Sequence, residues 1–350
     1  MSSRLDDFDY HLPVERIAQH AAPRGESRLL VLGASGGRRH RRIADLPELL
    51  EPGDLLVVND SRVLPARLFA RRRSAGGRVE LLLVERLAAR CWTALARPGR
   101  RLRAGSVLEI AGVLELTIEA VGDDGLYRLR GNRPLTPLLD RHGHIPLPPY
   151  IQRPDEPADR ERYQTVYARA PGSIAAPTAG LHFDDRLLAR LDRRGIELCT
   201  LTLHIGPGTF QPIRGELIDE HRMAGERFTV TPEAAAQVAY ARQRGGRVVA
   251  VGTTAVRTLE TVATDGGLID ADTGRTELFI RPGHRFRVVD LLLTNFHLPR
   301  STLLLLVCAL GGRERVLAAY REAVIEGYRF YSYGDAMLAG PDPDGQRPAR

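Results

Sequence analysis

Residues 247–260 read Arg247-Val-Val-Ala-Val-Gly-Thr-Thr-Ala-Val-Arg-Thr-Leu-Glu260. The valine-rich apolar run at the start predicts a short strand over residues 247–251. A glycine follows that run, and the residues after it predict a helix over residues 254–263. Strands that alternate with helices in this way are typical of α/β proteins with a partly parallel sheet.

The same alternation continues on both sides of this stretch. Thr231 is a suitable helix N-cap and is followed by Pro232, so we expect a helix over residues 231–244. Asp184 caps another expected helix, which ends at Gly195. The other expected elements are helices over residues 302–310 and 313–326 and strands over residues 29–32, 55–58, 197–205, 278–280 and 288–293.

The middle segment, residues 61–150, has a different pattern. Short runs of β-forming residues alternate with glycine and proline turns, which predicts a small antiparallel β-barrel. The segment carries 16 arginines and 8 acidic residues, so it holds the excess that gives the chain its net charge of +7. A basic surface favours a polyanion such as RNA, although a solvated surface without such a partner has the same composition.

The expected fold class is therefore α/β plus β. Residues 1–60 and 151–339 are expected to form an α/β domain built from both chain ends, with residues 61–150 as the inserted β-barrel domain. The proline-rich residues 145–154 are expected to form an extended linker. Residues 340–350 are expected to be a disordered tail.

Composition excludes several classes of protein. The 350 residues contain no apolar run of about 18, as a transmembrane helix needs, and the N-terminus lacks the apolar core of a signal peptide. Cys91, Cys199 and Cys308 are too far apart to indicate a disulfide framework or a cysteine metal site, so we expect a cytoplasmic protein. All 50 basic residues are arginine, which excludes Schiff-base lysine chemistry and a P-loop lysine. The glycine-rich residues 33–37 lack the spacing of a dinucleotide-binding loop and predict a hairpin turn.

Four later loops concentrate glycine, proline, threonine and histidine: residues 172–183, 204–212, 252–260 and 294–302. At least three of them follow an expected strand, and ligands of open α/β sheets bind beyond the carboxyl ends of strands. His182, His204 and His297 are candidates for proton transfer because histidine titrates near neutral pH. Their spacing matches no metal motif, so we expect no metal site. Taken singly, each loop is also explained by ordinary turn chemistry.

Seven segments, taken in order, resemble those of the S-adenosylmethionine:tRNA ribosyltransferase-isomerase family. The similarity extends from about Tyr10 to Leu338, and an ordered set of segments is a far more specific match than one short motif. The segments are residues 58–68, 146–150, 172–183, 204–212, 252–260, 290–302 and 328–337.

The resemblance implies one step of queuosine synthesis. The enzyme would transfer and isomerise the ribosyl unit of S-adenosylmethionine onto 7-aminomethyl-7-deazaguanine at the wobble position of tRNA. The product would be epoxyqueuosine in tRNA, with release of adenine and methionine. S-adenosylmethionine would then be a consumed substrate rather than a cofactor, tRNA would be the partner, and we expect a monomer with no cofactor and no membrane contact. The family's α/β domain with an inserted β-barrel agrees with the segmentation above.

The chain departs from the family pattern at two places. It reads Met223-Ala-Gly-Glu226 where similar proteins have histidine in the second position, so no histidine role carries over to Ala224, while Glu226 stays a candidate. It also reads Pro282-Gly-His284 where the family has a final tyrosine.

The implied reaction needs a base for the proton at the ribosyl C5′ beside the sulfonium and an acid for the departing adenine. The candidate catalytic residues are His182, His204, Glu226 and His297. Aromatic rings suit a sulfonium, carboxylates suit hydroxyls or an ammonium, and an arginine suits the methionine carboxylate. For the aromatic residues, packing in the core is the favoured explanation. The candidate substrate-binding residues are Thr178, Gly180, Phe183, Gly206, Gly208, Thr209, Phe210, Thr253, Thr254, Arg257, Asp290, Asn295, Phe296 and Asp335. The candidate contacts for tRNA phosphates are Arg62, Arg67, Arg71, Arg72 and Arg101.

Three other functions remain open from the residues alone. An S-adenosylmethionine-dependent tRNA methyltransferase would use the same two substrates, but it would be expected to carry a better glycine-rich loop after its first strand. A non-catalytic RNA-binding protein would explain the basic barrel, but not the loops rich in histidine, glycine and threonine. A third alternative is an α/β protein that binds some small nucleotide.

Overall fold

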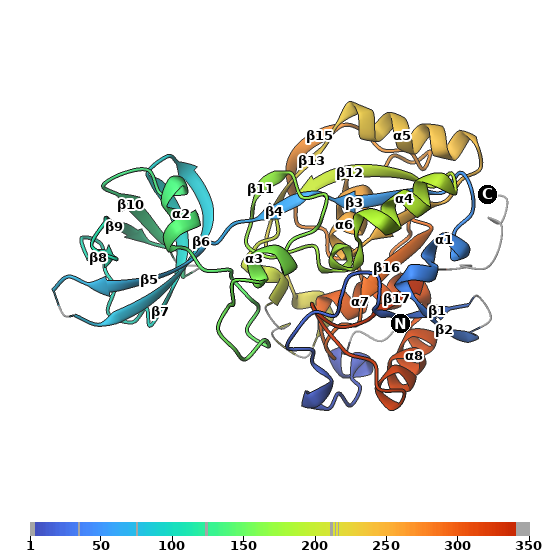
Figure 1. Ribbon diagram of the computed structural model, residues 1–350, viewed down its shortest axis with the longest axis horizontal. Helices are drawn as coiled ribbons and strands as arrows, with labels where there is room; N and C mark the ends of the chain where they lie inside the picture. The colour runs from blue at the N-terminus through green and yellow to red at the C-terminus, as the bar shows by residue number, and fades with distance from the viewer. Residues whose placement is uncertain are drawn as a thin grey trace.

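The computed structural model describes residues 4–33, 36–74, 76–122, 125–210, 213, 215 and 217–340. Figure 1 shows a layered α/β body and a barrel that projects from one end of it. Both ends of the chain belong to the body, and the barrel is inserted between them.

One nine-stranded mixed sheet forms the centre of the body. Its order is β15-β13-β12-β3-β14-β16-β17-β1-β2, and the four central neighbours β12, β3, β14 and β16 are parallel. The first three strands in the chain precede the barrel, and the other six follow it. The strands are Arg28–Leu32 (β1), Arg38–Arg42 (β2), Leu55–Asn59 (β3), Glu197–Leu203 (β12), Glu226–Val230 (β13), Val248–Val251 (β14), Asp272–Thr276 (β15), Leu291–Asn295 (β16) and Ala336–Ala339 (β17).

Helices cover both faces of this sheet. Val248 and Ala250 of β14 pack in the same core as α5, α6, α7 and α8, whereas Val249 and Val251 pack on the opposite face with α1 and α4. Because both faces are covered, all four residues of β14 are buried, which explains the unbroken apolar run. The helices are Leu46–Leu49 (α1), Asp185–Arg193 (α4), Pro232–Gln243 (α5), Thr253–Thr261 (α6), Thr302–Gly311 (α7) and Arg313–Ile325 (α8).

The inserted part is a closed antiparallel barrel of order β10-β7-β6-β5-β8-β9. Its strands alternate between core and solvent: in β10, Tyr127 and Leu129 point inward, while Arg128 and Arg130 are exposed. The helix Thr136–His142 (α2) adds Leu139 to the barrel core. The barrel strands are Arg67–Arg72 (β5), Arg78–Ala88 (β6), Cys91–Arg97 (β7), Val107–Ile110 (β8), Leu114–Val121 (β9) and Tyr127–Gly131 (β10).

Two short parallel strands, Ser61–Val63 (β4) and Ala170–Ser173 (β11), connect the body to the barrel. The chain passes from the carboxyl end of β3 through Asp60 into β4 and then into the barrel. It returns through the short helix Asp159–Arg162 (α3) and β11. The carboxyl edge of the parallel strands therefore faces the barrel (Figure 1).

The contact between barrel and body has an apolar and a charged component. Ile174, directly after β11, packs into the barrel core. Glu85 of β6 forms ion pairs of 3.4 Å with Arg227 of β13 and of 3.4 Å with Arg275 of β15. These contacts hold the barrel against the carboxyl edge of the parallel strands.

The predicted architecture of an α/β part built from both chain ends with an inserted antiparallel barrel is confirmed. The helix caps at Asp184 and Thr231 are confirmed as well, since each side chain accepts a hydrogen bond from a backbone N–H three residues later. Strands β1 and β2 pair antiparallel with Leu32 opposite Arg38, as a hairpin turn between them requires. The domain boundaries at 60/61 and 150/151 stay a prediction, and residues 341–350 of the predicted tail lie outside the described residues.

Two predicted strands need correction. Residues 278–280 form no strand, and the carbonyl oxygen of Leu278 instead accepts a hydrogen bond of 3.0 Å from Nε of Arg257. The strand expected over residues 288–293 is β16, which begins only at Leu291. No strand was predicted from the sequence at the positions of β2, β4, β5, β8, β11, β13, β15 or β17. In β2 all five residues are exposed, so that strand has no apolar pattern to recognise.

Within the described ranges, no helix is both long and apolar enough to cross a membrane.

Candidate active site

A pocket lies at the carboxyl edge of the parallel strands and holds about 650 Å³ of space, part of it open to solvent. Three of the four predicted loops, residues 172–183, 252–260 and 294–302, contribute to it together with residues 328–337. Of the fourth loop, residues 204–212, Ile205 lines the pocket. Segments that are far apart in the sequence therefore meet at the edge that faces the barrel.

Asn59, at the end of β3, links the elements at this edge. Its Nδ2 donates to the carbonyl oxygen of Leu203 (3.0 Å) and to Oγ1 of Thr254 (3.2 Å). Its Oδ1 accepts from the backbone N–H groups of Ser61 (3.0 Å) and Leu203 (3.0 Å). One buried amide thus joins β3, β12, β4 and the first turn of α6. Asn59 lies in the matched segment 58–68, but it was not among the predicted site residues.

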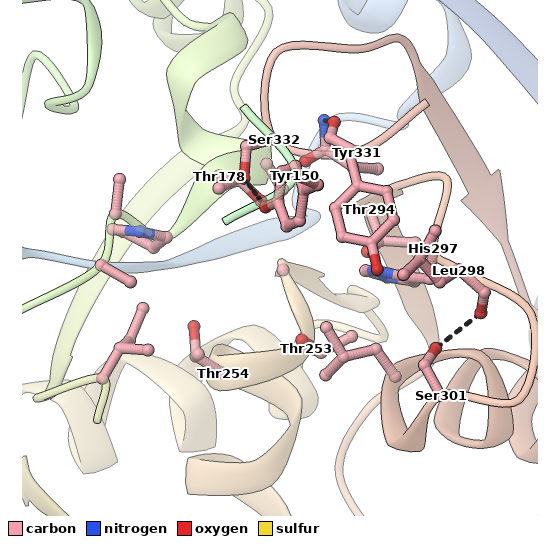
Figure 2. Close-up of a pocket in the computed structure, with 18 residues that line it drawn as sticks. Tyr150, Thr178, Thr253, Thr254, Thr294, His297, Leu298, Ser301, Tyr331 and Ser332 are labelled. Carbon is pink, nitrogen blue, oxygen red and sulfur yellow. Dashed lines mark hydrogen bonds between the residues drawn. The ribbon is translucent and has the colours of Figure 1, made fainter. Parts of the chain in front are cut away.

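The amino ends of two helices border the pocket. Gly252, with a φ of +88°, precedes α6, and Thr253 and Thr254 of its first turn line the pocket. Ser301 caps α7 by accepting from the backbone N–H of Leu304 (3.2 Å). The hydroxyl of Ser301 also donates to the carbonyl oxygen of Leu298 (2.8 Å), as Figure 2 shows.

The polar groups that line the pocket are mostly hydroxyls. Among the described residues that line it there is no carboxylate and no arginine. The side-chain hydroxyls belong to Tyr150, Thr178, Thr253, Thr254, Thr294, Ser301, Tyr331 and Ser332. This lining suits a neutral, hydrogen-bonding ligand group.

His297 is the one predicted catalytic residue that lines the pocket. Its Nε2 lies 2.9 Å from Oγ1 of Thr294. Burial lowers the pKa of His297 from 6.5 to about 3, because the imidazolium would lose its hydration. The imidazole is therefore neutral at physiological pH.

His182 lies next to the pocket rather than in its lining. Its Nδ1 is 3.0 Å from Oγ of Ser27, and its Nε2 is 3.2 Å from Nδ2 of Asn295. Burial, with smaller contributions from three nearby arginines, lowers its pKa to about 3. Because both ring nitrogens have partners, this histidine can orient Asn295, which does line the pocket.

A second cluster surrounds Glu226 at the start of β13. Its carboxylate accepts hydrogen bonds from Arg257 and from the backbone N–H of Gly206 (2.9 Å). Arg257 is 3% exposed and also donates to the carbonyl oxygens of Leu278 (3.0 Å) and Thr276 (3.3 Å). The guanidinium expected to bind a substrate carboxylate is thus held by groups of the protein.

His204, directly after β12, lies against Gly172. A Cβ at Gly172 would approach Nδ1 of His204 to 2.7 Å, so the glycine leaves room for the ring. That Nδ1 is buried and has no hydrogen-bond partner among the described residues. Burial first, and then Arg227, lowers the pKa of this imidazole.

Several predicted substrate-binding residues are not brought to the pocket. Phe183 and Phe296 are fully buried core residues. Asp290 lies before β16, at the opposite edge of the sheet, where it accepts from Arg242 (2.9 Å) and from the backbone N–H of Val248 (2.8 Å).

Others occupy tight or separate positions. Asp335 accepts from the backbone N–H groups of Arg28 (2.9 Å) and Arg329 (2.8 Å) and so fixes the turn before β17. Gly180 lies against Tyr167, where a side chain would clash with the phenol. Gly208 lies near Ala224. The predictions for Thr209 and Phe210 concern side chains outside the described part of the chain.

The arginines proposed for tRNA differ in exposure. Nη2 of Arg67 donates to the carbonyl oxygen of Leu147 (2.7 Å), and its Nε lies 3.2 Å from Glu80, so this guanidinium is engaged within the protein. Arg72 is half-buried at the end of β5. The exposed members of the set are Arg62, Arg71 and Arg101.

Sequence reasoning missed an aromatic part of the lining. Tyr150 and Tyr331 have ring centroids 3.8 Å apart with an angle of 52° between the planes. Oη of Tyr150 lies 2.5 Å from Oγ of Ser332. The signal was present, since these residues lie in the matched segments 146–150 and 328–337, but no role was attached to them.

Among the described residues, no group of three His, Cys, Asp or Glu side chains is arranged to hold a metal ion. That the protein has no metal site stays a prediction.

Comparison with known proteins gives consistent matches over nearly the whole chain. The model of the family described as queuosine biosynthesis protein matches residues 5–339. Two curated relatives carry the name S-adenosylmethionine:tRNA ribosyltransferase-isomerase. The chain is 59% identical to the one from Anaeromyxobacter dehalogenans (strain 2CP-C), over 96% of this chain and 99% of the relative. It is 54% identical to the one from Moorella thermoacetica, again over 96% of this chain and 99% of the relative. A crystal structure of S-adenosylmethionine tRNA ribosyltransferase from Thermotoga maritima is 40% identical, with a TM-score of 0.55, and the match covers 95% of this chain and 99% of that one.

Proposed function

Because the chain belongs to the queuosine biosynthesis protein family, as an S-adenosylmethionine:tRNA ribosyltransferase-isomerase, we propose the following reaction for it. The enzyme transfers the ribosyl unit of S-adenosylmethionine to 7-aminomethyl-7-deazaguanine at the wobble position of tRNA and isomerises it. The product is epoxyqueuosine in tRNA, and adenine and methionine leave.

One observation carries this proposal: the pocket lies at the edge of the sheet that faces the arginine-rich barrel. A tRNA bound along the barrel would bring one base to the mouth of the pocket, where S-adenosylmethionine binds. The hydroxyl lining suits the ribosyl and purine groups of that substrate, because both offer several donors and acceptors.

His297 is our candidate for the proton acceptor. Proton transfer requires a group within hydrogen-bond reach of the substrate, and His297 is the one predicted catalytic residue that lines the pocket. Its neutral state leaves the ring free of the proton that it must take from C5′. Deprotonation beside the sulfonium starts the rearrangement that releases adenine and then methionine.

Glu226 and Arg257 are proposed as a positioning pair. Their buried ion pair binds the backbone N–H of Gly206, and so holds the loop that follows β12 against the pocket. Removal of either partner would break this buried ion pair, which is strongly destabilising. This arrangement does not depend on the family histidine that Ala224 replaces.

The remaining properties are proposed on the same basis. S-adenosylmethionine is consumed as a substrate, and the enzyme needs no further cofactor or metal. It acts in the cytoplasm as a monomer, with tRNA held by exposed arginines of the barrel and its connecting strand, Arg62, Arg71 and Arg101.

The test is an incubation of the protein with S-adenosylmethionine and tRNA that carries the aminomethyl-deazaguanine, followed by chromatography of the small products. Adenine and methionine that appear together, and only with the modified tRNA, support ribosyl transfer. S-adenosylhomocysteine would instead identify a methyltransferase. Binding of tRNA without any small product would identify a non-catalytic RNA-binding protein. The control is tRNA with unmodified guanine at the same position.

A further inference from the structure

Two tyrosines that are distant in the sequence form one aromatic wall of the pocket. Tyr150 lies in the proline-rich segment 145–154 after the barrel, and Tyr331 lies between α8 and β17. Their rings contact each other, with centroids 3.8 Å apart. Figure 2 shows the two tyrosines on one side of the pocket, with Thr253 and Thr254 of α6 on the other.

The backbone at Tyr331 is held in an unfavourable conformation. Its φ is +74°, in the left-handed region that favours glycine. Its N–H donates to the carbonyl oxygen of Phe296 (3.0 Å), and its own carbonyl oxygen accepts from Nδ2 of Asn295 (3.1 Å) and from the backbone N–H of Gly334 (2.9 Å). A residue stays in such a conformation only where its surroundings fix it, and such residues cluster at ligand sites. Glycine would adopt this backbone conformation without strain, so a tyrosine at this position lowers the stability of the fold.

The second ring is fixed through its hydroxyl. Oη of Tyr150 forms a hydrogen bond of 2.5 Å with Oγ of Ser332, the neighbour of Tyr331. This contact fixes the edge of the ring and so its orientation in the wall of the pocket. Both tyrosines keep their phenols protonated, because burial raises their pKa values well above the usual range.

The absence of charged side chains among the described residues of the lining indicates which part of a ligand the two tyrosine rings would bind. The described lining contains no carboxylate to balance a cation, and His297 in that lining is neutral. A cationic sulfonium would therefore find no opposite charge in the described lining, whereas a flat neutral heterocycle gains stacking and hydroxyl partners. We propose that Tyr150 and Tyr331 bind the adenine base of S-adenosylmethionine by stacking, opposite the hydroxyls of Thr253 and Thr254. This inference rests on the proposed function, because it takes S-adenosylmethionine as the ligand.

Isothermal titration calorimetry on the full chain tests the proposal with two ligands. One is S-adenosylmethionine, and the other is 5′-methylthioadenosine, which keeps the adenosine but lacks the charge and the amino acid. In Tyr331→Leu the affinity for both should fall about tenfold, as expected for one lost base–aromatic contact. Tyr331→Phe keeps the ring and should keep the affinity. Tyr240→Leu removes an exposed tyrosine on α5 and is the matched control.

Two results would overturn the proposal. If Tyr331→Leu weakens S-adenosylmethionine but not 5′-methylthioadenosine, the rings bind the sulfonium instead. If neither affinity changes in Tyr331→Leu or in Tyr150→Leu, the wall does not bind the ligand. If Tyr331→Leu does not fold, Tyr150→Leu tests the same contact with the two ligands. These titrations need no tRNA and no turnover, so their failure is separate from that of the proposed reaction, which the product analysis tests.

Discussion

At the level of single residues, two buried imidazoles have different partners. His297 lines the pocket, whereas both nitrogens of His182 contact Ser27 and Asn295. Their sequence contexts are alike, since each lies a few residues before the start of a helix. The distinction between a candidate base and a positioning residue comes from the hydrogen-bond partners.

We expect His297→Gln to lower turnover by about 10²–10⁴, the usual contribution of one general base. Binding of S-adenosylmethionine should persist, because glutamine fills a similar volume and keeps a hydrogen-bonding end. Single-turnover formation of adenine and calorimetric binding measure the two effects. His20→Gln, at an exposed position, is the control. Unchanged turnover in His297→Gln would remove this residue from the mechanism.

The same two histidines make stability depend on pH. Their pKa values fall from 6.5 to about 3 on folding, so below pH 6.5 the unfolded chain takes up protons that the folded chain does not bind. The stabilisation is therefore complete above about pH 6.5 and is lost as the pH falls toward 3. Each histidine changes the free energy of unfolding by up to about 1.4 kcal/mol per pH unit in that range.

Urea unfolding at pH 7.5 and pH 5 measures this dependence. His182→Gln should have a smaller loss of stability between the two pH values than the wild type, whereas His20→Gln should have the same loss. An equal loss in His182→Gln and in the wild type would show that this imidazole is not held neutral by the fold.

At the level of elements, the turn before α6 places the first helical turn at the pocket. Gly252 has a φ of +88° and a ψ of 155°, a backbone region that essentially only glycine occupies. Space is not the constraint, because a Cβ there would meet the Ala179 side chain at an ordinary 3.6 Å. Backbone conformation alone requires the glycine.

Gly252→Ala should lower the free energy of unfolding by about 1–3 kcal/mol and also weaken binding of S-adenosylmethionine. Gly245→Ala, after α5, is the matched control, because its φ is +76° and a Cβ there would meet nothing within 4 Å. Both variants should lose stability in urea unfolding, but only Gly252→Ala should lose affinity in calorimetry. Equal affinities in the two variants would contradict a role for this turn in binding.

The sequence predicted the elements with strong local signals and missed those without them. The valine run of β14 and the caps at Asp184 and Thr231 are local, so they were found. Strand β15, from Asp272 to Thr276, is polar and mostly exposed, and only its pairing with β13 makes it a strand. We expected β16 to begin at residue 288, which placed Asp290 inside the strand. The strand begins at Leu291, so Asp290 lies at its amino end, at the edge of the sheet opposite the pocket.

The candidate site was predictable to a similar extent. The loops at the carboxyl edge were expected from strand order, and the structure brings three of them together. The Tyr150–Tyr331 pair was not expected, because 180 residues separate its two rings in the chain and only the fold brings them into contact. Phe183 lies shortly after a glycine and Phe296 directly after a strand, as residues of a binding site often do. The structure instead buries both rings in the core.

At the level of the whole molecule, the proposed reaction requires the barrel and the pocket to bind the same tRNA. Phosphate contacts release counterions, so the slope of log Kd against log salt concentration reports their number. The double variant Arg71→Gln and Arg101→Gln should reduce this slope by about 1–2. Arg193→Gln with Arg194→Gln removes the same charge from exposed positions at the end of α4, which runs away from the barrel, and is the control. Equal slopes for the two double variants would contradict tRNA binding by the barrel.

The insertion of the barrel also sets an order of events during synthesis on the ribosome. The barrel consists of consecutive strands between residues 67 and 131, so it can close soon after they emerge. The central sheet must wait, because β1 pairs with β17, which ends at Ala339. At translation rates of about 5–20 residues per second, the intervening chain takes roughly 10–40 s to appear. For that time the apolar strands β1 and β3 have no partners from the C-terminal half, so we expect the nascent chain to need protection from aggregation while its barrel is already folded.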